Sequence, residues 1–186
     1  SLTFGNITKE KDVEALVYGV GAGVRDMVCW NALLQVEKGA YADEADESRR
    51  GARMLELEAG TADLWEAWYQ VIMGAETVLS HVDVVEMPNE RRQFYRGQAY
   101  FFTALAYFDL IRRWGDCILQ KGGINWEPVA KTPWPKVCDF AIEMAEKAAE
   151  ILPPFDKLTD CNGNTMLSKS TPCQGAAYAL LAHLCA

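Results

Sequence analysis

Apolar residues recur at steps of three and four along five stretches of the chain, whereas the alternation typical of strands is nearly absent. Such spacing places apolar side chains on one face of a helix. Each stretch is bounded by proline, glycine or polar residues, as helix ends commonly are. The pattern predicts an all-α chain with helices near residues 8–28, 61–82, 90–114, 134–151 and 172–186.

Residues at the ends of these stretches suggest how the helices begin and end. Thr8 and Asn89 are good N-cap residues for the first and third helices. Gly115 follows the third helix at the position where glycine commonly ends a helix. Thr171 and Gln174 have the spacing of a capping box, which predicts that the last helix starts there.

The third helix is apolar on nearly every side. Arg96, Asp109 and Arg112 interrupt it, so it is too charged for a membrane span, which needs about 20 apolar residues. Apolarity on all sides instead indicates burial on more than one face. We therefore expect this helix to lie at the centre of a helical stack.

Three glycines fall within the first helix, at positions 19, 21 and 23. Each costs about 1 kcal/mol relative to alanine in a helix interior, so we expect another backbone to pass close by. A phosphate-binding loop is the alternative, but it needs a preceding strand and its full motif spacing, which the sequence lacks.

Tryptophans of the second helix, Trp65 and Trp68, fall on its apolar stripe. They are therefore expected in the core, although they could form a ligand platform. Residues 36–60 are charge-dense and aperiodic, and residues 117–133 are rich in glycine and proline. Both segments are expected to be connections, and long connections tend to be functional or mobile.

The net charge of −8 argues against nucleic acid and anionic lipid as partners. No secretory signal is visible in the sequence. The cysteines and histidines do not have the spacing of metal ligands, so no cofactor is expected. The six cysteines are interpreted as small core residues, with a Cys161–Cys173 disulfide left open.

No nucleophile elbow, phosphate loop or zinc-protease motif occurs, and the carboxylates Glu143, Glu146 and Glu150 lie on a polar face. We therefore do not expect an enzyme.

Four segments in order resemble the SusD/RagB-like family of outer-membrane nutrient-binding lipoproteins of Bacteroidetes. They are LWEAWYQVIMGAETVLSHV, RGQAYFFTALAYFDLIRRWGDCIL, TPWPKVCDFAIEMAEKAAEILPP and LSKSTPCQGAAYALLAHLCA, within residues 64–82, 96–119, 132–154 and 167–186. The chain departs from the family pattern at Glu76, Gln98, Thr103 and Trp114. The resemblance covers only the N-terminal helical part of a typical member. Residues 1–186 are accordingly expected to be one helical domain and a fragment of a longer protein.

The resemblance implies a tetratricopeptide-like stack of helix hairpins. It also implies capture of a glycan or other nutrient at the outer surface of the outer membrane. The implied partner is a SusC-type TonB-dependent transporter, and the membrane would be reached only through a lipid anchor outside this chain.

Sugars bind by stacking on aromatic rings, with polar groups fixing their orientation. Loop aromatics with polar neighbours are therefore the candidate ligand contacts: Tyr41 with Asp43, Trp126 with Asn125, and Trp30 at a helix end. Two alternatives stay open from the residues, namely a helical protein-interaction module without a small-molecule site and a hydrolase using two carboxylates.

Overall fold

The computed structural model describes residues 7–29, 58–121, 129–166 and 168–186. Within these residues the chain forms five α-helices, one short 3₁₀ helix (η2, Phe155–Lys157) and two isolated β-bridges, without a strand. The helices are α1 (Glu10–Cys29), α3 (Glu58–Val82), α4 (Asn89–Trp114), α5 (Trp134–Ile151) and α6 (Gln174–Leu184). The predicted all-α, tetratricopeptide-like class is confirmed.

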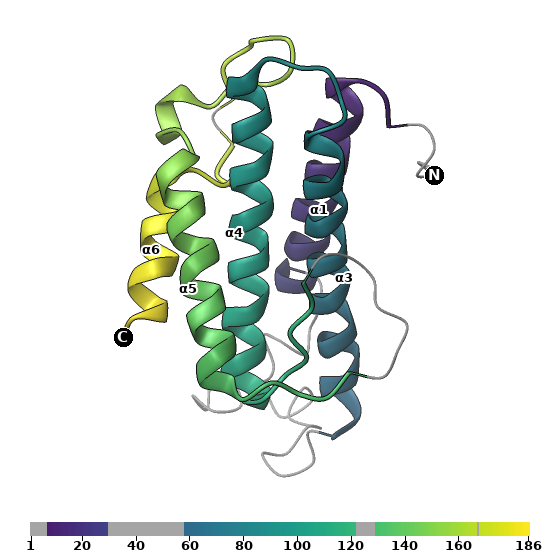
Figure 1. The fold of residues 1–186 in the computed structure, drawn as a ribbon, viewed down its shortest axis with the longest axis vertical. Helices are drawn as coiled ribbons and strands as arrows, with labels where there is room; N and C mark the ends of the chain where they lie inside the picture. The colour runs from purple at the N-terminus through teal and green to yellow at the C-terminus, as the bar shows by residue number, and fades with distance from the viewer. Residues whose placement is uncertain (1–6, 30–57, 122–128, 167) are drawn as a thin grey trace.

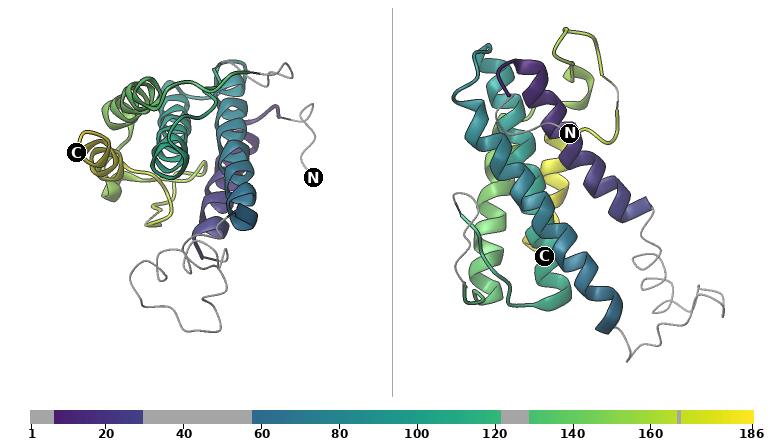
Figure 2. Two further views of the ribbon diagram at one scale, coloured as in Figure 1. Left: turned by 90° about the horizontal axis from the view of Figure 1, so that it is seen from below. Right: turned by 90° about the vertical axis from the view of Figure 1, so that its right-hand side faces the viewer.

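Each helix packs against the next one along the chain, so the helices form a stack of hairpins (Figures 1 and 2). Helix α4 contacts α3 and α5 most extensively and also touches α1 and α6. It is therefore the central helix, as its all-round apolarity predicts.

Close packing around α4 depends on small residues. Ala99, Ala104 and Ala106 are buried, and a Cβ placed on Gly97 would lie only 2.9 Å from the Cγ and Cδ2 atoms of Leu152. Helix α5 can approach α4 closely because Gly97 has no side chain.

The first and third helices begin differently from the prediction. Helix α1 begins at Glu10, and the Asp12 carboxylate accepts hydrogen bonds from the backbone N–H groups of Thr8 and Lys9, at 3.1 and 2.9 Å. The capping contact is therefore made by the Asp12 side chain with the Thr8 backbone, and not by the Thr8 side chain. Helix α4 includes Asn89, and Pro88 takes the N-cap position.

The last helix also begins later than its sequence signature suggests. Helix α6 starts at Gln174, with Cys173 at the N-cap and Thr171 buried outside the helix. The Thr171 N–H donates to the Ser168 carbonyl at 3.1 Å, and the Gln174 side-chain amide donates to the Ala149 carbonyl at 3.1 Å, so the two residues do not form the predicted capping box. Helix α3, by contrast, begins at Glu58, inside the segment expected to be a connection.

Glycines of α1 do not meet a neighbouring backbone, which corrects the expectation for Gly19, Gly21 and Gly23. A Cβ at Gly19 or Gly23 would have no neighbour within 4 Å, and one at Gly21 would touch only the Phe102 ring at 3.4 Å. The close approach of α1 and α3 occurs instead at Gly74, where a Cβ would lie 2.7 Å from Val20 Cγ2. All three α1 glycines are helical, which excludes a phosphate loop there.

Candidate functional site

The candidate ligand residues Trp30, Tyr41, Asp43, Asn125 and Trp126 all lie outside the residues that the structure describes. Their role in ligand contact stays a prediction. The structure does describe the chain segments next to them in sequence, namely the end of α1, the start of α3 and the two segments that flank residues 122–128.

The segment after α4 is fixed by two tyrosine hydroxyls. Tyr69 OH accepts the Ile118 N–H at 2.8 Å and donates to the Ile118 carbonyl at 2.7 Å. Tyr107 OH contacts Gln120 in the same way, accepting from its N–H at 2.9 Å and donating to its carbonyl at 3.3 Å. Each hydroxyl thus bonds both the N–H and the carbonyl of one residue, as a neighbouring strand would. Burial raises the pKa of both tyrosines.

The returning half of this loop is held against the outgoing half. Cys117 and Thr132 exchange two backbone hydrogen bonds, with N···O distances of 2.8 and 3.3 Å. Cys117 is fully buried, and burial raises the pKa of its thiol to about 11. Residues 122–128, which carry Asn125 and Trp126, therefore join two anchored chain segments.

Tryptophans of α3 belong to the core rather than to a ligand platform. Trp68 is buried, and its Nε1–H donates to Asp109 Oδ2 at 2.7 Å, which Arg113 also contacts at 2.6 Å. Trp65 is half-buried and meets the Trp114 ring edge-on at a centroid distance of 5.3 Å.

A buried polar cluster ties the segment after α5 to α1 and α4. Arg91 contacts Glu10 at 2.7 Å and Glu14 at 3.3 Å, and it donates to the Thr159 carbonyl at 2.9 Å. Tyr95 OH accepts from Arg91 and donates to Glu10, at 2.7 and 2.9 Å. Because every member has a partner, this cluster is interpreted as structural.

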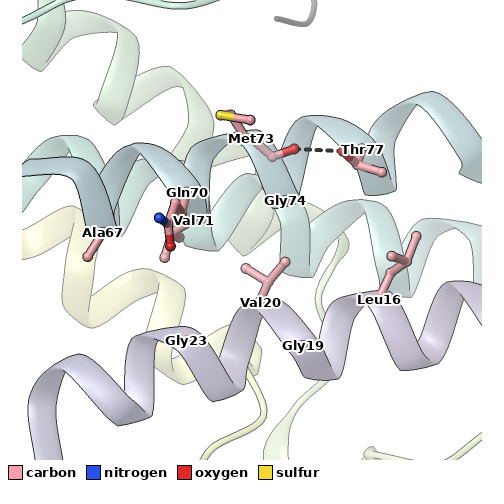
Figure 3. A pocket seen from close by; sticks show the side chains of 10 residues that line it. All are labelled: Leu16, Gly19, Val20, Gly23, Ala67, Gln70, Val71, Met73, Gly74 and Thr77. Atoms are coloured by element: carbon pink, nitrogen blue, oxygen red, sulfur yellow. Dashed lines mark hydrogen bonds between the residues drawn. The ribbon is translucent and has the colours of Figure 1, made fainter. Parts of the chain in front are cut away.

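A groove of about 410 Å³ lies between α1 and α3 (Figure 3). Neither a charged nor an aromatic side chain is among the described residues that line it, and the Thr77 hydroxyl bonds back to the Met73 carbonyl at 2.8 Å. The groove therefore suits an apolar partner better than a sugar. Its lining residues are Leu16, Gly19, Val20, Gly23, Ala67, Gln70, Val71, Met73, Gly74 and Thr77.

A second cavity, of about 610 Å³, lies where the end of α4 meets the start of α5 and the end of α6. Trp134 borders it and is 54% exposed, although its spacing from Val137 and Ala141 places it on the apolar stripe of α5. Spacing alone would place this residue in the core, but residues 134–136 at the start of α5 are all exposed and burial begins at Val137. The cavity is lined by Phe108, Ile111, Arg112, Gly115, Trp134, Cys138, His183 and Leu184.

Cys161 and Cys173 are both free, so the open alternative of a disulfide between them is not realised in this structure. The described part of the chain contains no cluster of side chains able to hold a metal ion. None of its helices combines the length and the apolarity needed to cross a membrane. The carboxylates Glu143, Glu146 and Glu150 are exposed on α5, as the sequence indicates.

Comparison with known proteins gives one consistent result. Residues 38–185 match a family model named SusD-like and described as starch-binding and associating with the outer membrane. The SusD-like protein P2 of Formosa agariphila is 24% identical over 185 residues, which cover 92% of this chain and 35% of that protein. The chain thus spans about a third of this relative's length.

Solved structures agree on the fold. A SusD-like protein from Bacteroides fragilis superposes with a TM-score of 0.73 at 18% identity, covering 95% of this chain and 34% of the other. A SusD-like carbohydrate binding protein from Bacteroides vulgatus gives a TM-score of 0.74 at 17% identity, with coverages of 96% and 41%. At these identities the likeness shows a shared fold.

Proposed function

The chain belongs to the SusD-like family, and we propose that it is the helical part of a glycan-binding protein at the surface of the outer membrane. The observation that carries the proposal is the family match over residues 38–185, together with the shared fold. In this proposal residues 1–186 are one helical domain of a longer protein. The protein binds its ligand without transforming it and hands it to a SusC-type TonB-dependent transporter, while a lipid anchor outside this chain holds it at the membrane.

The helical stack supports this role as a rigid frame. Tyr69 and Tyr107 fix the segment that leads into residues 122–128, and the bridge at Cys117 and Thr132 fixes its return. An anchored loop presents its side chains at little entropic cost, because its ends are already ordered. Asn125 and Trp126 are therefore the ligand contacts that we favour, followed by Tyr41, Asp43 and Trp30.

The experiment is a glycan panel applied to the full-length protein, combined with purification from membranes. We expect at least one soluble glycan to bind and a TonB-dependent transporter to co-purify. Failure of both would contradict the proposal.

A second candidate, a helical interaction module without a small-molecule site, is favoured by the apolar groove between α1 and α3. Polar substitutions in that groove separate the two candidates. If the protein binds no glycan and the Ala67→Asp variant loses a protein partner, the interaction module is favoured. If the Ala67→Asp variant still binds a glycan, the first proposal is favoured.

A further inference from the structure

The cavity at the junction of α4, α5 and α6 has features that a structural role does not explain. Trp134 stands at the first position of α5, and its backbone N–H donates to Asp116 Oδ1 at 2.8 Å. The backbone is thereby fixed, although half of the side chain is exposed to solvent. An exposed indole on a fixed backbone is a ready surface for the apolar face of a sugar ring.

A guanidinium lies in the same cavity. Arg112 is exposed in the last turn of α4, and its Cζ lies 5.0 Å from the centroid of the Phe108 ring, one helical turn earlier. The His183 ring of α6 packs near that phenyl ring at a centroid distance of 6.0 Å. Stacking on Phe108 holds the guanidinium plane but leaves its N–H donors available, since stacking uses none of them.

Carboxylates are absent from the lining as far as the described residues go. This is notable in a chain with 26 acidic residues and a net charge of −8. The neighbouring acids are engaged elsewhere, because Asp109 contacts Arg113 and Trp68, and Asp116 accepts the Trp134 N–H. Among the described residues no carboxylate pairs with Arg112, so this cation is open to an external anion.

An indole face beside an unpaired guanidinium matches a sugar that carries a carboxylate. The ring would stack on Trp134, and Arg112 would hold the carboxylate with two parallel hydrogen bonds. The volume of about 610 Å³ lies within the range of small-molecule sites. The lining imidazole of His183 offers a further polar contact to hydroxyl groups, whereas the Cys138 thiol points to the Leu184 carbonyl at 3.8 Å.

We propose that this cavity is a glycan subsite for uronic-acid residues, with Trp134 as the stacking surface and Arg112 as the carboxylate ligand. The inference rests on the proposed glycan-binding function and names the ligand class of one site within it. The subsite is built from other residues than the candidate loop residues, whose contribution is a separate prediction.

The test is calorimetric titration of the full-length protein with tetragalacturonate and with neutral maltotetraose. We expect tetragalacturonate to bind, Trp134→Ala to weaken its binding at least tenfold, and Arg112→Gln to do the same. Arg112→Lys should recover part of the lost affinity, because lysine keeps the charge without the planar fork. Binding of maltotetraose should change less than threefold in Arg112→Gln.

Matched controls are an exposed tyrosine of α6 and an exposed arginine of α1. Tyr178→Ala and Arg25→Gln remove a similar ring and a similar charge elsewhere on the surface, so they should leave tetragalacturonate affinity unchanged. The inference is overturned if tetragalacturonate does not bind, or if Arg112→Gln has no more effect than Arg25→Gln. Either result would leave the proposed function standing if a neutral glycan of the panel binds.

Discussion

Two helical glycines of this chain, Gly97 and Gly19, sit in opposite environments. Gly97 faces α5, where the Cγ of Leu152 and the Cγ1 of Ile151 would lie 2.9 and 3.0 Å from an added Cβ. Gly19 has open space around the same position. The first glycine is required by packing, and the second is not.

Valine substitutions should separate these two environments. Gly97→Val should lower the free energy of unfolding by about 1–3 kcal/mol, because the added methyl groups overfill the contact with α5. Gly19→Val should change it by less than about 0.5 kcal/mol, since the two residues differ little in helix propensity and nothing is displaced. Urea unfolding measures both, and equal effects would refute the packing argument.

Residue types alone could not have revealed this difference. The sequence concentrates attention on Gly19, Gly21 and Gly23 because three glycines in one helix are unusual. The tight contacts lie instead at Gly74 and Gly97, which are single glycines whose neighbours come from other helices. Which glycine meets a neighbour is decided by helix packing, and local spacing does not contain that information.

At the scale of elements, the segments between helices are held by specific polar contacts. Arg91 of α4 joins Glu10 and Glu14 of α1 to Thr159, and its side chain is only 15% exposed. Arg96, on the same helix, pairs with Asp83, whose side chain is 66% exposed. The two arginines thus offer a buried and an exposed pair on one helix.

Replacing Arg91 or Arg96 by glutamine should lower the free energy of unfolding by different amounts. Arg91→Gln leaves two carboxylates without their cationic partner in a largely buried place, so we expect a loss of about 2–4 kcal/mol in unfolding free energy. Arg96→Gln should cost less than about 1 kcal/mol, as exposed ion pairs do. Thermal and urea unfolding check this, and similar losses at both positions would contradict the assigned role of the cluster.

The hydroxyl of Tyr69 gives a local prediction for the loop frame. Tyr69→Phe removes the acceptor of the Ile118 N–H and the donor to its carbonyl, at a local cost of about 1–3 kcal/mol. The Ile118 amide should then exchange with solvent roughly tenfold faster or more. Tyr178→Phe on exposed α6 is the matched control and should leave that exchange rate unchanged. An unaltered rate in Tyr69→Phe would show that the hydroxyl does not hold the segment.

Helix α5 shows what the sequence can specify at this scale, and α6 shows where it stops. Residues 134–151 are predicted to the residue, because Pro135 suits a first turn and Pro153 with Pro154 prevents continuation. Helix α6 begins later than predicted, because the Gln174 N–H bonds to the Pro153 carbonyl at 2.9 Å and its side chain reaches Ala149. These partners come from α5 and its end, so a local capping signature could not anticipate them.

On the scale of the whole molecule, the order of five amphipathic or apolar helices was enough to predict a helical stack around α4. Family motifs within that order predicted the SusD-like class, which the family match supports. The cavity beside Trp134 was not predicted, because it forms only where three helix ends meet. Each end lies more than 15 residues from the others in sequence, at Arg112, Trp134 and His183.

The central claim is that the helical stack is a frame that carries ligand-contacting loop residues. Its most direct test is calorimetric titration of the full-length protein and its Trp126→Ala variant with a glycan identified from the panel. The account predicts that the variant binds at least tenfold more weakly while its melting temperature stays within about 2 °C of the unsubstituted protein. Unchanged affinity in Trp126→Ala, or a loss of affinity that merely follows a loss of stability, would contradict it.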